Sequence, residues 1–290
     1  MWAPQTLFEP SSYDDLITGK IPALIVPGIL SKTECSSLCS RISNTQTTNE
    51  SPRKFGTSLS SHIYEKSKYF SNAKTSNEFL KKLFPENTSP LVSMREIISK
   101  IFRKQLTTAI ENGMSYSDAV IRIHGNDDSV HLHRDNSNFE MSDYNVSHLK
   151  NQLSAILYLQ SPEVGGELTI FHKMWSKIDE RMREPNFGYS SDLIKDVNQT
   201  KISPVAGTMV ILNPKFYHQI ESVFGLTSRI SIGFSLGNCL KSIFALGLDY
   251  FTNISIVSNL FWLFAISANS MSESISIHFD SPLNLTWSST

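Results

Sequence analysis

Two histidines and an aspartate form the strongest chemical pattern in this sequence. His133 and Asp135 stand two residues apart, and His218 lies much further along the chain. On a β-strand, residues two apart project to the same side, so His133 and Asp135 can reach one metal ion while Arg134 points away. Two imidazoles and one carboxylate are the ligand set of non-heme Fe(II) oxygenases. The spacing therefore predicts a metal site that His218 completes from a distant strand.

A second polar group follows His218. Arg229 opens the segment Arg-Ile-Ser-Ile-Gly-Phe, and Ser231 shares a face with Arg229 if this segment is a strand. A buried arginine beside a metal suits a dicarboxylate co-substrate, because the guanidinium fork binds a carboxylate through two hydrogen bonds. We expect Arg229 to bind such a co-substrate.

The N-terminal part of the chain is predicted to be mainly helical. A short buried strand over 21–29 is followed by Ser31-Lys-Thr-Glu34, a capping box that opens a helix to about Ile42. Residues 44–75 are rich in Ser, Thr, Asn and Lys, and we expect irregular surface structure there with at most short strands. Residues 90–112 show an apolar stripe at helical spacing after Ser89-Pro90, which predicts a long helix that packs on a sheet.

From Ala119 onward the pattern changes to short β-rich segments. Their connections are mostly too short for helices, so antiparallel pairing is favoured. The fold class predicted is α+β, a jelly-roll core backed by N-terminal helices. The predicted strands are 119–124, 153–159, 167–171, 207–212 and 229–236.

The domain organisation predicted is one domain over 1–290. Residues 1–118 are its helical support, and 119–237 form the catalytic core. Within the core, the charged connection 173–203 is long enough to be a lid or a specificity element. Residues 238–290 are expected to be a helical or irregular extension.

Composition excludes several classes of protein. The 26 basic and 27 acidic residues nearly balance, which argues against a nucleic-acid binder. Hydrophobic residues make up 40% of the chain, too many for general disorder. No signal peptide is visible, and three cysteines suit buried thiols in a reducing compartment, so we expect a cytoplasmic protein. The apolar segment 254–268 is shorter than a membrane span and is interrupted by polar residues, which favours a buried or interface helix.

Several motifs together resemble the 2-oxoglutarate/Fe(II)-dependent dioxygenase superfamily, in particular its prolyl-hydroxylase-like branch. The resemblance spans about residues 119–237 and implies a double-stranded β-helix. Val120-Ile-Arg122 and the strand from Arg229 to Phe234 also resemble the cyanobacterial halogenases that tailor alkaloids. The residues that carry the resemblance are His133-x-Asp135, Tyr158-Leu159, Gly165-Gly166-Glu167-Leu168-Thr169, Pro204-x-x-Gly207, His218 and Arg229-x-Ser231.

The resemblance implies a role for each residue of the site. His133, Asp135 and His218 would bind Fe(II), and Arg229 would bind 2-oxoglutarate with help from Ser231 and Tyr158. With O2 as the third reactant, the enzyme would oxidise an unactivated C–H bond of a small amino-acid-derived or alkaloid substrate, releasing succinate and CO2. Weaker candidates for substrate contacts are Arg122, His131 and Thr169.

One departure from the halogenases bears on the reaction. They carry a small residue in place of the carboxylate ligand, which leaves room for halide, whereas this chain has Asp135. The resemblance therefore favours hydroxylation over halogenation.

Four alternatives stay open at this stage. His131 rather than His133 could bind the metal. The reaction could be an oxidative radical cyclisation of the kainoid-synthase type, or the substrate could be a protein, as for prolyl hydroxylases. A cupin-like binding module is the non-enzyme alternative. A kinase, suggested by the tripeptide His133-Arg134-Asp135, is set aside because the chain lacks a glycine-rich phosphate loop and an Asp-Phe-Gly motif.

Overall fold

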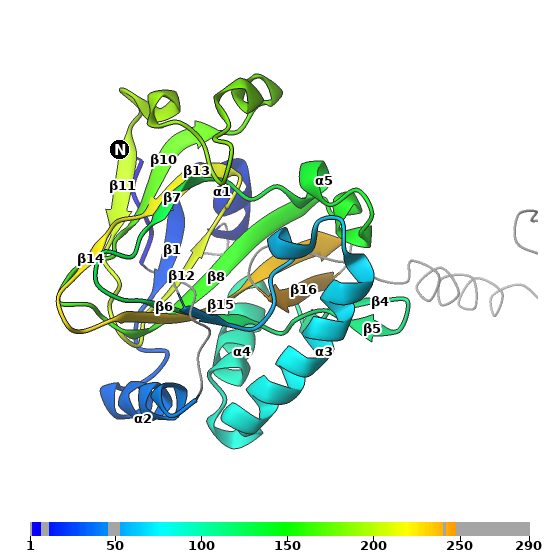
Figure 1. Ribbon diagram of the computed structural model, residues 1–290, viewed down its shortest axis with the longest axis vertical. Helices are drawn as coiled ribbons and strands as arrows, with labels where there is room; N and C mark the ends of the chain where they lie inside the picture. The colour runs from blue at the N-terminus through cyan, green and yellow to red at the C-terminus, as the bar shows by residue number, and fades with distance from the viewer. Residues whose placement is uncertain (1, 7–11, 46–52, 240–241, 248–290) are drawn as a thin grey trace, which may run out of the picture. The chain divides into compact units, whose positions relative to one another are not determined.

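Two β-sheets pack face to face in the computed structural model, and helices cover the outer face of the larger sheet (Figure 1). The structure describes residues 2–6, 12–45, 53–239 and 242–247. Strand pairing between the named strands is antiparallel except for β16 with β3. This confirms the α+β class and the antiparallel pairing predicted from the sequence.

The larger sheet has eight described strands. Its main path runs β1 (Ala23–Val26), β12 (Met209–Leu212), β8 (Asn151–Gln160), β15 (Arg229–Cys239), β16 (Ser242–Gly247) and β3 (Leu106–Thr108). Beside it, β6 (Val120–His124) pairs with β15, and β2 (Arg53–Phe55) pairs with β6.

The smaller sheet has the order β11 (Gln199–Ile202), β10 (Leu168–Met174), β13 (Phe216–Ile220) and β7 (Val130–His133). Two short pairs lie apart from both sheets, β14 (Val223–Phe224) with β9 (Val164–Gly165), and β4 (Ile110–Glu111) with β5 (Met114–Ser115).

Helices come mainly from the first part of the chain. The α-helices are α1 (Ser12–Thr18), α2 (Lys32–Ser43), α3 (Lys66–Leu83), α4 (Pro90–Phe102) and the short α5 (Ser137–Glu140). The short 3-10 helices are η1 (Ser60–His62), η2 (Glu86–Thr88), η3 (Asn145–His148), η4 (Lys177–Met182) and η5 (Ser191–Ile194).

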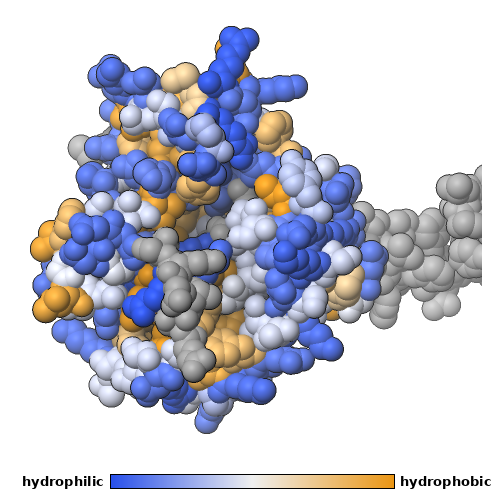
Figure 2. Space-filling model, in the orientation of Figure 1, coloured by the Kyte–Doolittle hydropathy of each residue, from blue (hydrophilic) through white to orange (hydrophobic). Residues whose placement is uncertain are grey.

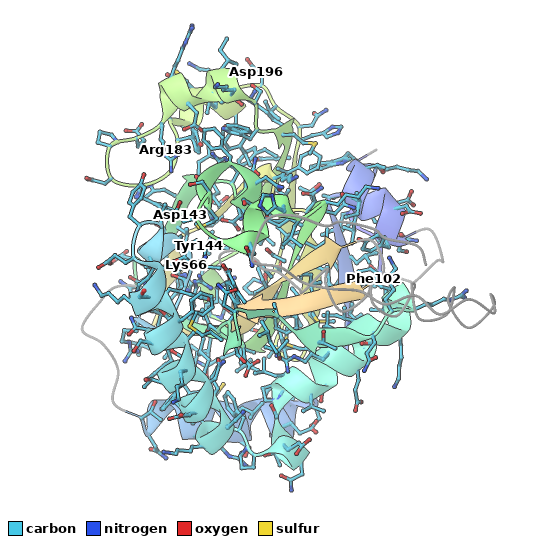
Figure 3. The ribbon with its side chains drawn as sticks, turned by 90° about the vertical axis from the view of Figure 1, so that its right-hand side faces the viewer. Lys66, Phe102, Asp143, Tyr144, Arg183 and Asp196 are labelled. Atoms are coloured by element: carbon cyan, nitrogen blue, oxygen red, sulfur yellow. The ribbon has the colours of Figure 1, made fainter. Side chains whose placement is uncertain are left out.

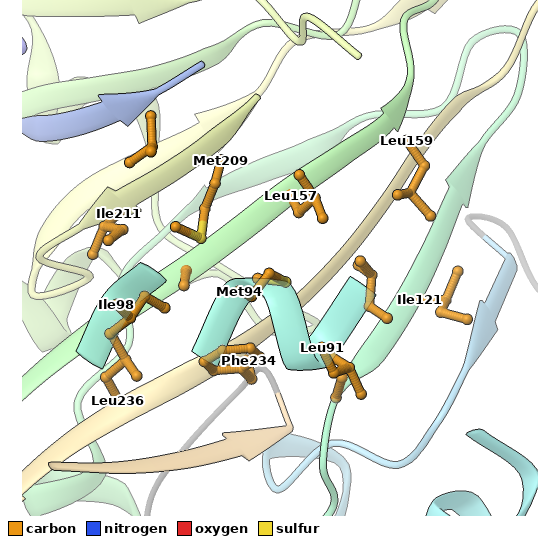
Figure 4. Packing of buried hydrophobic residues seen from close by; sticks show 14 of the residues in the cluster. Leu91, Met94, Ile98, Ile121, Leu157, Leu159, Met209, Ile211, Phe234 and Leu236 are labelled. Carbon is orange, nitrogen blue, oxygen red and sulfur yellow. The ribbon is translucent and has the colours of Figure 1, made fainter. Parts of the chain in front are cut away.

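Strand alternation divides the larger sheet into two faces with different neighbours. One face carries Leu157, Met209 and Phe234, which pack against Met94 and Ile98 of α4 (Figure 4). The opposite face packs against the smaller sheet through residues from both sheets. These are Ala23, Tyr158, Val210 and Leu212 on one side, and Leu168, Ile170, Ile202, Phe216 and Ile220 on the other.

The connection 173–203 covers the outer face of the smaller sheet. Its residues Trp175, Leu193 and Ile194 pack around a cluster that includes Leu132 and Tyr217. The connection also contains η4, η5 and β11. Its predicted role as a lid stays a prediction.

Two sequence-based predictions about the N-terminal part were wrong. The helix predicted over 90–112 ends at Phe102, because Arg103 adopts a left-handed conformation and Leu106 begins β3. Within 44–75, predicted to be irregular with at most short strands, β2 is such a short strand, but the 18-residue helix α3 begins at Lys66. The capping box at Ser31 and Glu34 is confirmed at the start of α2.

The mispredicted helix α3 is attached to the rest of the chain at its first turn. Lys66 Nζ donates a hydrogen bond to the backbone oxygen of Asp143 and lies 5.3 Å from the centre of the Tyr144 ring (Figure 3). Lys66 also pairs with the buried carboxylate of Glu111. Part of the polar composition that suggested a surface loop belongs to the exposed face of α3, which carries Lys68, Ser71 and Lys74.

Among the described residues, no helix is long and apolar enough to cross a membrane. The apolar segment 254–268 and most of the predicted extension 238–290 lie outside the described residues. Cys35 and Cys39 are buried free thiols, as predicted.

Replacing Met94 by alanine should lower the free energy of unfolding by about 2–5 kcal/mol, because this fully buried side chain fills the space between α4 and the sheet. Met114→Ala is the matched control, since Met114 is 41% exposed and should cost well under 1 kcal/mol. Urea unfolding of both variants measures the difference. Equal losses would contradict the packing described for α4.

Candidate metal and co-substrate site

His133 and His218 lie directly opposite each other on neighbouring strands of the smaller sheet. β7 ends at His133, and β13 carries His218 at its centre, with the two residues paired in register. Asp135 follows β7, and its backbone N–H donates a hydrogen bond of 2.8 Å to the backbone oxygen of Pro214, which fixes its position. One ligand atom from each of the three lies within 4.8 Å of the others, an arrangement that could hold a metal ion. His218 Nε2 lies 3.9 Å from Asp135 Oδ2.

Both imidazoles are oriented by backbone carbonyl groups. His133 Nδ1 lies 2.8 Å from the oxygen of His131, and His218 Nδ1 lies 2.9 Å from the oxygen of Phe216. A carbonyl oxygen can only accept, so each Nδ1 carries the proton and each Nε2 keeps its lone pair. Metal-binding histidines characteristically show this arrangement. The donor set therefore fits a transition-metal ion on the two Nε2 atoms and a carboxylate oxygen.

Arg134, between the two residues of the motif, projects to the opposite side of β7, as the spacing predicted. Its fully buried guanidinium pairs with Glu140 at 2.8 Å and Glu180 at 3.0 Å, and lies 4.7 Å from the centre of the Trp175 ring. Glu180 also accepts from Tyr189 Oη at 2.5 Å. This network fastens η4 and the following loop to the metal-binding motif.

Glu180 is ionised more readily than an ordinary glutamate. Partial burial raises its pKa, but hydrogen bonds from Tyr189, Trp175, Arg183 and Arg134 outweigh this and lower the pKa to about 2. Arg183, labelled in Figure 3, additionally pairs with Glu140.

The second wall of the site is formed by β15 and β6 of the larger sheet. Arg229 is 2% exposed and pairs in register with His124, while Ser231 pairs with Arg122. Arg229 Nη1 lies 3.4 Å from Ser231 Oγ, and the guanidinium carbon lies 5.0 Å from the centre of the Tyr158 ring. Burial lowers the pKa of Arg229. No described carboxylate forms an ion pair with this guanidinium, and its Nε–H has no hydrogen-bond partner, so the wall fits an incoming carboxylate.

His124 is a residue of this wall that sequence reasoning missed. It lines the cavity, and its Nδ1 lies 3.4 Å from Arg229 Nη1. Burial, followed by the charges of Arg229 and Arg122, lowers its pKa to about 2, so the ring is neutral. Because the guanidinium only donates, Nδ1 accepts and the buried Nε2–H has no described partner. The alternation of Arg122 and His124 on one strand was the signal that could have identified it.

Gly166, in the segment that precedes β10, lies so close to Arg229 that a side chain there would collide with it. It has φ +70°, and a Cβ atom placed there would lie 2.9 Å from Arg229 Cδ. Any side chain would therefore push the guanidinium stem away from its position.

The two walls enclose a cavity of about 670 Å³. Figure 2 shows a hollow on this face of the molecule with both hydrophobic and hydrophilic side chains on its walls. The cavity is lined by His133, Asp135, His218, Arg229 and Ser231, and also by the predicted substrate contacts Arg122 and His131.

Two predicted site residues do not line the cavity. Thr169 lies on the opposite face of β10 from Leu168 and Ile170, and its hydroxyl donates to Glu221 at 2.6 Å, so its prediction as a substrate contact was wrong. Tyr158 is fully buried and contacts Arg229 through its ring rather than forming part of the cavity wall.

Comparison with known sequences finds relatives over most of the chain. The family model of the carrier-protein-independent halogenase WelO5 matches residues 1–242. Leucinostatins biosynthesis cluster protein S from Purpureocillium lilacinum is 25% identical over 165 residues, which cover 54% of this chain and 67% of that protein.

Solved structures with the same fold include two oxygenases. The N-substituted L-amino acid dioxygenase from Burkholderia ambifaria AMMD has a TM-score of 0.59 at 14% identity, covering 82% of this chain and 91% of that one. HygX from Streptomyces hygroscopicus, solved with nickel and 2-oxoglutarate bound, has a TM-score of 0.51 at 13% identity, covering 82% and 89%. At these identities the likeness concerns the fold.

Gly166→Ala should weaken 2-oxoglutarate binding by about 10-fold, because the added methyl group displaces the Arg229 stem. Gly28→Ala is a matched control, since Gly28 has φ +71° and open space around it. Both variants carry a similar backbone penalty of roughly 1–2 kcal/mol, but only the first should change the affinity measured by calorimetry. Unchanged affinity in Gly166→Ala would contradict the contact.

Glu180→Gln should lower the free energy of unfolding at pH 7, because the ionised carboxylate anchors Arg134 and Tyr189. The pKa of Glu180 is depressed from 4.5 to about 2, so its stabilisation is present above pH 4.5 and is lost as the pH falls toward 2. The difference between wild type and variant should therefore shrink below pH 4.5 in denaturant unfolding. Glu96→Gln, at an exposed position on α4, is the control. A pH-independent difference would show that the charge of Glu180 contributes nothing.

Proposed function

The chain belongs to the family of the carrier-protein-independent halogenase WelO5, and we propose that it hydroxylates an unactivated C–H bond of a small biosynthetic molecule. The protein is an Fe(II)- and 2-oxoglutarate-dependent oxygenase, as the sequence resemblance implied. Its family membership excludes the alternative of a non-enzymatic cupin-like binding module. The observation that carries the proposal is the triad of His133, Asp135 and His218 facing the buried Arg229 across one cavity.

We assign the two facing sheets to a double-stranded β-helix, or jelly-roll. The support is the contact between the sheets and the shared fold with the Burkholderia ambifaria dioxygenase. In this fold the metal-binding strands β7 and β13 belong to one sheet, and Arg229 belongs to the other.

We assign Fe(II) to His133, Asp135 and His218. When bound, Fe(II) and 2-oxoglutarate supply the activation of O2 that oxidises the substrate C–H bond and releases succinate and CO2. The backbone carbonyls of His131 and Phe216 hold the two imidazoles with Nε2 toward the ion. His131 itself lies outside the group of three that surrounds the candidate metal position, which supports His133 as the ligand.

The larger sheet provides the co-substrate subsite in this proposal. Arg229 binds the distal carboxylate of 2-oxoglutarate, Ser231 supports the guanidinium, and His124 donates its Nε2–H to the same carboxylate. The ring of Tyr158 holds Arg229 in place. Fixing this carboxylate orients the keto acid toward the metal-binding triad.

The carboxylate of Asp135 supports hydroxylation over halogenation. It fills the coordination position that must stay open for halide in a halogenase, and it is only 5% exposed beside His218. The cavity volume of about 670 Å³ suits a small substrate together with 2-oxoglutarate better than a protein chain. Oxidative cyclisation and protein hydroxylation stay sequence-based predictions.

Succinate formation tests the proposal. Anaerobically Fe(II)-loaded protein, given 2-oxoglutarate and air, should form succinate, and His133→Ala, Asp135→Ala and Arg229→Ala should each reduce the rate by more than roughly 100-fold. His131→Ala is the matched control and should keep the activity, because its imidazole lies outside the triad. Activity that is lost in His131→Ala but retained in His133→Ala would transfer the ligand role to His131. Succinate formation that survives in Asp135→Ala would contradict the carboxylate ligand.

A further inference from the structure

One aromatic side chain stands half exposed beside the metal-binding triad. Phe187 belongs to the connection 173–203 and is 50% exposed, and the centre of its ring lies 5.3 Å from the centre of the His133 ring. It lines the cavity that contains the triad. It also lines a second cavity of about 580 Å³, which residues of the connection form together with residues of β7 and β13. Phe187 therefore stands where the two cavities meet, next to a metal ligand.

The turn that carries Phe187 is held in place by backbone contacts. The N–H of Glu184 donates to the oxygen of Gly188 at 3.0 Å, which closes the turn, and the N–H of Tyr189 donates to the oxygen of Leu132 at 2.8 Å. Gly188 has φ +87°, and a Cβ atom there would lie 2.5 Å from the same Leu132 oxygen, so the turn lies directly against β7. These contacts fix the position of Phe187 beside the triad without burying its ring.

Two further apolar side chains stand at the same junction. Val130 of β7 and Ile220 of β13 pair in register, and both line the two cavities, as Phe187 does. The same two strands carry His133 and His218, so this apolar wall lies beside the metal ligands. Apolar and aromatic side chains that line a cavity are typical of a ligand-binding surface. In the proposed function 2-oxoglutarate extends from the triad to Arg229 on the larger sheet, which leaves this wall to the substrate.

We propose that Phe187 is a specificity-determining residue that packs against an aromatic ring of the substrate. This inference rests on the proposed function, because it places the substrate in the cavity beside the triad. Two aromatic rings in contact gain more than the burial of their apolar area alone, which favours an aromatic group over a saturated one of the same size. The substrate class is a small molecule with an aromatic ring, and the second cavity provides room for the part of the molecule beyond this ring.

Two matched probes test this inference without turnover. Protein loaded with redox-inert Zn(II) and saturating 2-oxoglutarate is titrated by calorimetry with 3-phenylpropan-1-ol and with 3-cyclohexylpropan-1-ol, which differ only in the ring. The ratio of the affinity for the aromatic probe to that for the saturated probe should be at least about 3-fold higher in the wild type than in Phe187→Leu. Leucine keeps an apolar contact but removes the contact between two rings. Phe187→Tyr should keep the wild-type ratio because the ring remains.

Phe224→Leu is the matched control, because Phe224 is 48% exposed, lies on β14 and lines neither cavity. It should keep the wild-type ratio. An equal ratio in the wild type and Phe187→Leu would overturn the inference, as would the absence of binding of both probes to the wild type.

The 2-oxoglutarate affinity of each protein is measured in the same series and should not change in Phe187→Leu. A loss of 2-oxoglutarate affinity as large as the loss of affinity for the aromatic probe would assign Phe187 a structural role and would also refute the inference. If 2-oxoglutarate fails to bind the wild type, the proposed function fails. If it binds normally and the ratio does not depend on Phe187, only the aromatic contact is refuted.

Discussion

The buried positive charge of Arg229 is the constraint on which the organisation of the site depends. Removing a guanidinium from water is costly unless an anion compensates it, and no described carboxylate of the chain does so. The Tyr158 ring and the absence of a side chain at Gly166 keep Arg229 beside the cavity rather than in contact with solvent. In the proposed function, the distal carboxylate of 2-oxoglutarate compensates this charge, which would link the stability of the wall to the co-substrate.

The alternation of side chains along the strands decides which residues of the site face the cavity. On β15 and β6, the isoleucines face the helices while Arg229, Ser231, Arg122 and His124 face the cavity. On β7 the same two-residue period sends His133 toward the cavity and leaves Leu132 on the outer face. Arg134, beyond the strand end, anchors η4 through Glu180. The alternation of side chains along this segment therefore places the metal ligand His133 on one side and the ion pair of Arg134 that holds η4 on the other.

The parts of the site with a local signal could be predicted from the sequence. His133 and Asp135 are two residues apart, as are Arg229 and Ser231 on β15. Strand periodicity alone predicts that each pair shares a face, and the structure brings all four residues to one cavity. His124 was missed although its alternation with Arg122 on β6 carried a local signal, because its position beside Arg229 depends on the register between β6 and β15, which tertiary packing sets. Thr169 was assigned to the wrong face, although its alternation with Leu168 and Ile170 carried the information. The helix predicted over 90–112 was too long because pairing of Leu106 with β16 overrides helical periodicity.

The most direct test of the account is an anaerobic titration of the protein with Fe(II) and then with 2-oxoglutarate, followed by visible absorption. We predict one Fe(II) ion per chain, and a new absorption band that appears only when both Fe(II) and 2-oxoglutarate are present, because the keto acid would bind the metal held by His133, Asp135 and His218. An unchanged spectrum on addition of 2-oxoglutarate to the Fe(II)-loaded protein would contradict the central claim that the triad and Arg229 form one site.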